Sequence, residues 1–299
     1  MLVGIVDVGS NTIRMNIYRI ENQTFENLLS KKEAVGLVAY IKKKRYTKEG
    51  MDALKDCLLS FKDTAQALHL DGFHVFATAS LRNIENTEEV LAYIQKTCDV
   101  SIDLLSGEEE ARLSFKGALS KIQFENGYYI DTGGGSTEIV RFKKKEPMDP
   151  ISLPIGSLNL YQKYVDQIIP NKKEASAIRK EIENQFTDCI KKKKKVDNLT
   201  ITGGSMRAIR SLLIRLDEMN PESYDIDSNM IHSLVDELLN RPSKEVIRLF
   251  LKVKADRVHT LFTGLLIVDT LLDLTQAKHI QVSMFGVREG YVLERILKQ

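Results

Sequence analysis

The chain has 299 residues, of which 43% are hydrophobic and 28% are charged, and its formal net charge is +2. This composition is typical of a globular protein and excludes collagen-like and low-complexity chains. The near balance of charge gives no support to a nucleic-acid-coating or membrane-surface protein, and the length favours two domains over one.

Cysteine use and the first residues point to one compartment. The cysteines Cys57, Cys98 and Cys189 are odd in number, which favours reduced thiols over a disulfide framework. The N-terminus has an acidic residue at position 7 and no basic region, so it predicts a strand and not a signal peptide. The most apolar stretch, Leu261–Leu274, contains two aspartates and is shorter than the ~20 residues of a membrane-spanning helix. We therefore expect a cytoplasmic protein without a membrane or nucleic-acid partner.

The first half of the chain alternates strands with helices. Short β-branched or alternating runs predict strands, and apolar residues at helical spacing predict helices. The expected strands are Leu2–Val6, Ile13–Ile20, Phe25–Val35, Phe73–Thr78 and Ile102–Leu105. The expected helices are Thr47–Leu70 with Thr47 as N-cap, Thr87–Lys96 and Gly107–Leu119.

The second half repeats this opening. The expected elements are strands Gly127–Ile130 and Thr137–Phe142, helices Ser157–Val165 and Glu174–Lys191, strand Leu199–Thr202, a mostly helical remainder from Ser228, a strand near Ile280–Ser283 and a last helix from Val287. The repeat predicts two α/β domains that face each other, residues 1–122 and 123–299, with the last helix packing back on the first domain.

The strongest chemical signal is a turn of small residues that occurs twice, each time after a strand. The first copy is DVGSNTIR at 7–14 and the second is DTGGGSTE at 131–138. Glycine lets the backbone approach a ligand, and successive N–H groups in such a turn form a concave anion site. An aspartate at the strand end can hold a hydrated cation, because Mg²⁺ keeps several waters and takes only one or two carboxylates. Two such turns predict a grip on one phosphate chain and one metal ion.

A third glycine turn, at 202–205, follows a strand and opens a helix. This context favours an anion site at the helix N-terminus, with a plain turn as the alternative. No Walker loop is present, because Gly-Lys-Ser/Thr does not follow at the required spacing. A dinucleotide fingerprint is excluded as well, because Gly133–Gly135 opens a strand hairpin.

Two further segments carry charged groups next to these turns. In SGEEEAR, at 106–112, Ser106 caps a helix, and one of the three glutamates that follow is a candidate general base. In ATASLRN, at 77–83, Arg82 offers bidentate donors to phosphate. The basic runs Lys42–Arg45, Lys143–Lys145 and Lys191–Lys195 predict solvated loops or helix ends, with an electrostatic funnel for a polyanion as the alternative.

Together these segments resemble the Ppx/GppA phosphatase family, which comprises exopolyphosphatases and guanosine pentaphosphate phosphohydrolases of the actin-like ATPase and sugar-kinase superfamily. The similar segments are DVGSNTIR (7–14), ATASLRN (77–83), SGEEEARLSFKG (106–117), DTGGGSTEIV (131–140), SLPIGSLNL (152–160), TGGSMRAI (202–209) and FGVREG (285–290). The resemblance implies two actin-like (ribonuclease H-like) α/β domains with an active site in the cleft between them. One departure is Lys254, which stands where the family has arginine before Ala-Asp.

The resemblance also implies roles for individual residues. It makes Glu109 the catalytic base and Asp7, Asp131 and Glu138 the metal ligands. The implied phosphate-binding residues are Gly9, Ser10, Asn11, Thr12, Arg14, Arg82, Gly133, Gly134, Gly135, Ser136, Gly203, Gly204 and Ser205. The expected cofactor is Mg²⁺, with Mn²⁺ as an alternative.

The expected function is Mg²⁺-dependent release of terminal phosphate from linear polyphosphate. Longer family members carry a further C-terminal domain, so we expect short chains and distributive cleavage here. The alternatives are hydrolysis of pppGpp, a kinase or ATPase of the same superfamily, and a non-catalytic polyphosphate or alarmone sensor. The expected partners are a small polyanionic substrate and a second copy of the chain, joined through helices between 228 and 299.

Overall fold

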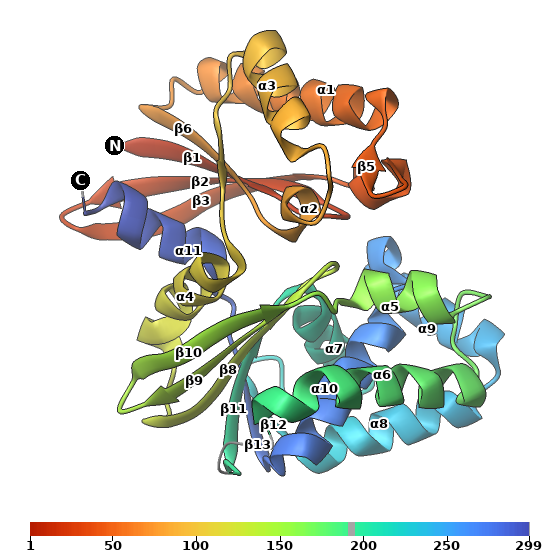
Figure 1. The fold of residues 1–299 in the computed structure, drawn as a ribbon. Helices are drawn as coiled ribbons and strands as arrows, with labels where there is room; N and C mark the ends of the chain where they lie inside the picture. The colour runs from red at the N-terminus through yellow and green to blue at the C-terminus, as the bar shows by residue number, and fades with distance from the viewer. Residues whose placement is uncertain (191–194, 299) are drawn as a thin grey trace. The chain divides into compact units, whose positions relative to one another are not determined.

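The computed structural model describes residues 1–190 and 195–298, which form two compact units. Unit 1 contains residues 1–110 and the chain end from Tyr291, and unit 2 contains Ala111–Gly290. The chain passes from unit 1 to unit 2 between Glu110 and Ala111, whereas the sequence repeat placed a boundary near residue 122. Helices and strands of both units are labelled in Figure 1.

Unit 1 is built on a five-stranded sheet in the order β3-β2-β1-β6-β7. Its strands are β1 (Leu2–Val8), β2 (Ile13–Glu21), β3 (Thr24–Glu33), β6 (Gly72–Ala77) and β7 (Ile102–Leu104). The first three strands form an antiparallel meander, and β6 and β7 run parallel to β1. All five strands predicted for the first half are therefore confirmed, with ends that differ by a few residues.

The two faces of this sheet carry different side chains. Helices α1 (Lys48–Ala67) and α3 (Thr87–Cys98) cover one face, where Val6 and Val8 are buried with them. Because side chains alternate along a strand, Asp7 lies on the opposite face. Thr47 caps α1 as predicted, since its side chain accepts a hydrogen bond from Gly50 N.

Unit 2 repeats the same plan in a six-stranded sheet, in the order β10-β9-β8-β11-β13-β12. Its strands are β8 (Asn126–Thr132), β9 (Thr137–Lys143), β10 (Glu146–Leu153), β11 (Asn198–Thr202), β12 (Asp225–Asp227) and β13 (His279–Val282). Strands β8, β9 and β10 form the meander, and β11 and β13 run parallel to β8. Apart from the added edge strand β12, the order matches unit 1, which confirms the predicted duplicated α/β architecture.

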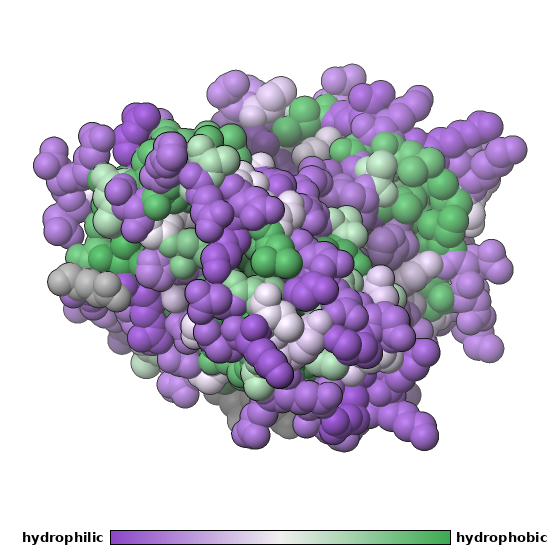
Figure 2. Space-filling view, turned by 90° about the horizontal axis from the view of Figure 1, so that it is seen from above, coloured by the Kyte–Doolittle hydropathy of each residue, from purple (hydrophilic) through white to green (hydrophobic). Residues whose placement is uncertain are grey.

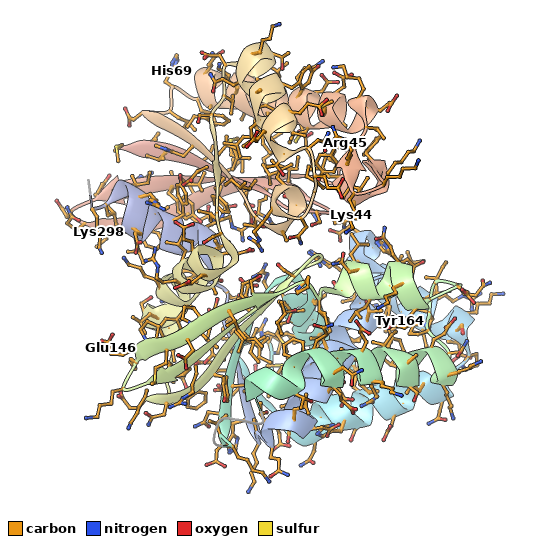
Figure 3. All side chains as sticks on the ribbon, viewed as in Figure 1. Lys44, Arg45, His69, Glu146, Tyr164 and Lys298 are labelled. Carbon is orange, nitrogen blue, oxygen red and sulfur yellow. The ribbon has the colours of Figure 1, made fainter. Side chains whose placement is uncertain are left out.

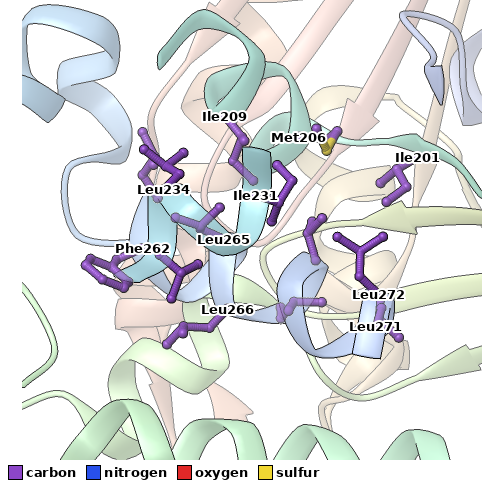
Figure 4. Close-up of a cluster of buried hydrophobic side chains, with 14 of the residues drawn as sticks. Ile201, Met206, Ile209, Ile231, Leu234, Phe262, Leu265, Leu266, Leu271 and Leu272 are labelled. Carbon is purple, nitrogen blue, oxygen red and sulfur yellow. The ribbon is translucent and has the colours of Figure 1, made fainter. Parts of the chain in front are cut away.

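Helix α10 (Leu261–Thr275) is the centre of the unit 2 core. Most of its side chains are buried and apolar, and it contacts α5 (Ser157–Tyr164), α6 (Lys172–Ile190), α7 (Gly204–Arg215) and α8 (Ser228–Asn240). Figure 4 shows its leucines packed among side chains from α7, α8 and β11. Each fully buried aliphatic side chain contributes roughly 1.5–3 kcal/mol, so this helix is a large part of the unit's stability.

One charge is buried within α10. The Asp269 carboxylate lies 2.7 Å from His232 Nδ1 on α8 and 2.5 Å from Arg179 Nη1 on α6. Burial raises the pKa of Asp269, and the Arg179 and His232 side chains oppose that shift. A buried carboxylate without partners costs several kcal/mol, so the Arg179 guanidinium and the hydrogen bond with His232 explain why the helix tolerates this residue.

The opposite face of the unit 2 sheet is covered by α4 (Gly107–Ala118), whose first turn belongs to unit 1. Phe115 packs against Tyr129 of β8 and Phe142 of β9. Tyr129 and Asp131 are two residues apart on one strand, so Asp131 also faces α4.

Several elements were not predicted. Strand β10 contains Pro147 and Pro150 and a bulge between Met148 and Ile151, features that are compatible only with an edge strand. The short hairpin of β4 (Ile41–Lys42) and β5 (Arg45–Tyr46) turns through Lys43 and Lys44, both with positive φ, where no Asn-Gly signal marks a turn. After α11 (Val287–Tyr291) the chain end forms a π-helical turn, η4 (Val292–Ile296).

The surface agrees with the composition. Polar and charged side chains cover most of the face in Figure 2, with apolar groups between them. Among the described residues no single helix is long and apolar enough to cross a membrane; one pair, Ser243–Arg257 with Leu261–Thr275, passes by length and composition but is bent by 93°. Cys57 and Cys98 are buried free thiols, and the Cys189 side chain lies outside the described residues.

Candidate active site

Carbonyl groups of the first turn and of the strand end before it accept hydrogen bonds from neighbouring segments. Gly36 N donates to Asn11 O at 2.9 Å, Val38 N donates to Ser10 O at 3.1 Å, and the Ser80 hydroxyl donates to Val8 O. In a planar trans peptide the next N–H points opposite to the carbonyl, so the amides of residues 9, 11 and 12 point away from these donors. A Cβ on Gly9 would lie 2.8 Å from Thr12 O, which explains glycine at this position. The turn therefore presents amides, as an anion site requires.

The strand end beside this turn carries the opposed charges of Asp7 and Arg14. The two residues pair in register on β1 and β2, so their side chains lie on the same face of the sheet. Arg14 Nη1 donates to Ser30 Oγ at 3.2 Å. Arg14 is thus fixed along β3.

Glu109 is held at both carboxylate oxygens. Its Oε2 accepts from Ser106 N at 3.0 Å, and its own N donates to Ser106 Oγ at 3.2 Å, which is a reciprocal capping box. Its Oε1 accepts from Arg295 Nη2 at 3.2 Å. The side chain remains 39% exposed, so a water molecule can reach it.

Arg82 lies beside the same helix start. Its Nη1 donates to Glu110 Oε2 at 2.9 Å and to Leu105 O at 3.0 Å. The planar fork of a guanidinium also matches the geometry of phosphate oxygens. Glu110 itself is buried and acts as the partner of Arg82, so it is a poor candidate for a base.

In the second turn the carbonyl groups also accept hydrogen bonds from a neighbouring segment, which here is the start of a helix. The N-terminus of α5 donates to its carbonyls: Ser157 N to Gly133 O at 3.0 Å and Leu158 N to Gly134 O at 2.9 Å. Asn159 Nδ2 donates to Gly135 O at 2.8 Å. By the same peptide geometry the amides of residues 134, 135 and 136 point away from α5. A Cβ on Gly156 would overlap the Gly134 carbonyl, so this close approach requires glycine.

Asp131 and Glu138 pair in register on β8 and β9, and both side chains face the α4 side of the sheet. Ser114 Oγ on α4 lies 2.5 Å from Asp131 Oδ2, and Ser152 Oγ donates to Glu138 Oε1 at 2.7 Å. Burial raises the pKa of Asp131, while the Ser114 hydroxyl and the nearby Arg207 and Arg288 guanidiniums lower it. Burial is the largest of these effects.

The third turn brings α7 against the end of β8. Gly203 has φ +101°, and a Cβ there would overlap Thr132 O and lie 3.0 Å from Asp131 Oδ1. Ser205 Oγ is buried without a hydrogen-bond partner in the described part of the chain. The predicted helix start after Gly203 is confirmed, and the turn lies next to Asp131.

Three arginines around this turn were not predicted as site residues: Arg207, Arg257 and Arg288. The Arg257 guanidinium occupies the space that a Cβ of Gly204 would fill. Burial lowers the pKa of Arg207, and the charges of Arg288 and Arg257 lower it further, against an opposite effect of Asp131. A cluster of guanidiniums favours negatively charged groups in its neighbourhood. Arg207 lies in TGGSMRAI and Arg288 lies in FGVREG, two of the segments that resemble the family. That resemblance could have marked both arginines as candidate site residues.

Comparison with known proteins decides the family. A family model described as "Ppx/GppA phosphatase family" matches residues 16–299. The chain belongs to the Ppx/GppA phosphatase family. This confirms the expected family and the expected class of enzyme, a hydrolase related to the exopolyphosphatases.

Relatives and solved structures agree with this assignment. "Exopolyphosphatase 1" of Mycobacterium tuberculosis is 23% identical over 99% of this chain and 88% of its own length. The crystal structure of the Aquifex aeolicus family member is 24% identical, with a TM-score of 0.82 over 100% of this chain and 98% of that one. An exopolyphosphatase structure from Cytophaga hutchinsonii is 22% identical, with a TM-score of 0.87 over 100% of this chain and 98% of that one. These structures share the fold of the present Ppx/GppA chain.

The carboxylates of unit 2 fit a hydrated metal ion. Mg²⁺ takes one or two protein carboxylates and keeps its waters, and Asp131 and Glu138 supply two on one face. Within residues 1–190 and 195–298, no three His, Cys, Asp or Glu side chains cluster into a metal site. The fit is therefore to an ion that holds most of its ligands as water and substrate oxygens.

The basic runs lie apart from these turns in the sequence. Lys44 and Arg45 stand on the β4–β5 hairpin (Figure 3), where Arg45 pairs with Glu89 at 2.9 Å. Tyr46 anchors the hairpin, since its hydroxyl donates to Ser80 O at 2.9 Å. Residues 191–194 of the third run lie outside the described residues.

Proposed function

We propose that this chain is an exopolyphosphatase that releases terminal phosphate from linear polyphosphate by attack of water. One observation carries the proposal: two turns, each after a strand-end aspartate, whose carbonyls are bound by neighbouring segments and whose amides point the other way. Two anion sites of this kind suit a chain of phosphates better than a single phosphate. Membership of the family supports the same reaction class.

In the proposed reaction Glu109 is the general base. It takes a proton from a water molecule, whose oxygen then attacks the terminal phosphorus in line. The bond between that phosphorus and its bridging oxygen breaks, and the shortened chain leaves with the electron pair. The amides of the two turns and the Arg82 guanidinium hold the phosphate oxygens and stabilise the charge that develops on them.

We propose that Asp131 and Glu138, with Asp7, hold Mg²⁺. Bound there, the ion would neutralise phosphate oxygens and orient the chain. Mutagenesis can test each of these residues by itself.

We also propose that short chains are good substrates. Each turn presents three amides, enough to hold about one phosphate group, so a short chain supplies every phosphate that the turns can bind. Gel analysis of a long-polymer digest tests this: a steadily shortening ladder supports distributive cleavage, and full-length polymer beside free phosphate contradicts it.

A homodimer in the cytoplasm completes the proposal. The buried free thiols of Cys57 and Cys98 support a reducing compartment. Light scattering of the purified chain measures the oligomeric state, and a monomer at all concentrations would contradict the dimer.

The decisive experiment is a phosphate-release panel with Mg²⁺. The substrates are tripolyphosphate, long polyphosphate, pppGpp and ATP, each with the parent chain, Glu109→Gln and the neighbouring control Glu108→Gln. We expect release from tripolyphosphate by the parent and by Glu108→Gln. Release from pppGpp alone favours the guanosine pentaphosphate phosphohydrolase, release from ATP alone favours a nucleotide hydrolase, and binding without release favours a sensor.

A further inference from the structure

The chain end packs on the face of the unit 1 sheet that α1 and α3 leave open. The Tyr291 ring stacks on Phe76 of β6, with centroids 5.0 Å apart and planes inclined by 22°. Tyr291 is buried, and its pKa is raised by burial first and then by the carboxylate of Asp103 at the end of β7. The chain end is therefore anchored by one aromatic residue.

A π-helical turn follows this anchor directly. Leu297 N donates to Val292 O at 3.0 Å, a bond across five residues. Such turns are rare and concentrate at functional sites. This one carries Arg295.

Arg295 joins three elements of unit 1. Its Nη2 donates to Glu109 Oε1 at 3.2 Å at the start of α4, and its Nε lies 4.0 Å from Asp103 Oδ2. The backbone of Ser106 holds the other oxygen of Glu109. The carboxylate is thus fixed from two sides, by its own helix start and by the chain end.

An exposed ion pair of this kind has little value for stability. Both side chains are 39% exposed, and solvent screens the attraction between charges at such positions. A guanidinium beside a carboxylate nonetheless fixes its orientation and favours its ionised form. A general base needs both effects, because its carboxylate must be ionised and must point towards the water molecule whose proton it takes.

We propose that Arg295 is a positioning residue for Glu109, which aims the carboxylate and keeps it ready to accept a proton. This inference rests on the proposed function, in which Glu109 is the base. Arg295 also lies beside the Asp103 carboxylate of β7, and the neighbouring Glu110 of α4 pairs with Arg82. The ion pair with Arg295 therefore favours the ionised form of Glu109.

The test compares Arg295→Met and Arg295→Lys in the full chain with tripolyphosphate and Mg²⁺. We expect Arg295→Met to lower kcat by about 10- to 100-fold, the cost of a misplaced reacting group, with KM unchanged. The acidic limb of the pH–rate profile should move to higher pH, because the carboxylate is then protonated more readily. Arg295→Lys should restore part of kcat and return the limb towards the parent.

Arg241→Met is the matched control, because Arg241 pairs with Glu237 on α8 in unit 2 and not with the proposed base. It should leave kcat and the pH profile unchanged. An unchanged pH profile in Arg295→Met, or a change in KM alone, would overturn the positioning role.

A double-mutant cycle separates positioning from loss of fold. In a Glu109→Gln background, Arg295→Met should have no further effect on kcat, since its target is already gone. An equal loss in both backgrounds would show that Arg295 acts independently of Glu109 and would overturn the inference. Full activity of Glu109→Gln itself would instead remove the proposed base, and that outcome is distinct from a failure of Arg295 alone.

Discussion

In both glycine-containing turns the carbonyl groups accept hydrogen bonds, but the donors differ between the two units. In unit 1 the carbonyls are bound by the Gly36–Val38 backbone and by the Ser80 side chain, and residues 9–12 remain half-buried. In unit 2 the N-terminus of helix α5 binds them, and Gly135 and Ser136 are buried. A helix start is a rigid set of donors, so we expect the second turn to be the less deformable one.

The charges around the turns differ as well. In unit 1 two of the three acidic side chains in the first turn of α4 pair with an arginine: Glu109 with Arg295, and Glu110 with Arg82. In unit 2 several guanidiniums gather around one carboxylate, Asp131. Under the proposed function we would expect proton transfer to depend most on unit 1, and the charges around Asp131 to contribute to polyanion binding in unit 2.

The largest effect is expected for the base. Glu109→Gln should lower kcat by about 10²–10⁴-fold, the usual range for a positioned general base. Glutamine can keep the capping box with Ser106, so the melting temperature should stay close to the parent. Steady-state kinetics and a thermal melt measure both, with the exposed neighbour Glu108→Gln as control; an unchanged kcat would rule Glu109 out.

The next largest effect is expected for Arg207, which we expect to contribute to binding of the polyanionic substrate. Arg207→Met should lower kcat/KM for tripolyphosphate by about 10- to 100-fold, the worth of one charged hydrogen bond, chiefly through KM. Burial and like charges lower the pKa of Arg207. A thermal melt of the variant shows whether its fold is intact. A lower kcat with unchanged KM would contradict the binding role.

A smaller effect is expected for the metal ligand. Asp131→Asn should raise the Mg²⁺ concentration for half-maximal activity by about tenfold, because one hard carboxylate is lost. Burial raises the pKa of Asp131, so the parent should need more Mg²⁺ as pH falls through that pKa and the carboxylate takes up a proton. The variant should lack this pH dependence. Identical Mg²⁺ titrations of parent and variant would refute the assignment.

The smallest effects are expected when one side-chain donor to each turn is removed, and the two losses of unfolding free energy can be compared. Ser80→Ala removes the donor to a buried carbonyl and should cost about 1–3 kcal/mol of unfolding free energy. Asn159→Ala removes a donor to Gly135 O but leaves the backbone donors of α5 in place, so it should cost less. Denaturant unfolding gives both values. A larger loss in Asn159→Ala would mean that the side chain, and not the helix start, supports the second turn.

The sequence predicted the elements that local chemistry determines. Both strand–turn–strand repeats, the Thr47 cap and the helix start after Gly203 follow from residues close together in the chain. Contacts between residues far apart in the sequence could not be predicted from local patterns. Arg207 of α7 and Arg288 of α11 both lie near Asp131, and Arg295 pairs with Glu109, which is 186 residues earlier in the chain. The hairpin through Lys43 and Lys44 was missed because lysine rarely adopts positive φ.

The central claim is that water attacks the terminal phosphorus of a bound polyphosphate. Hydrolysis of tripolyphosphate in ¹⁸O-labelled water, followed by ³¹P NMR or mass spectrometry of the products, tests it directly. The account predicts one ¹⁸O atom in each released inorganic phosphate and none in the pyrophosphate that remains after the first turnover. Label in the remaining pyrophosphate, or transfer of phosphate to an acceptor without incorporation of label, would contradict it.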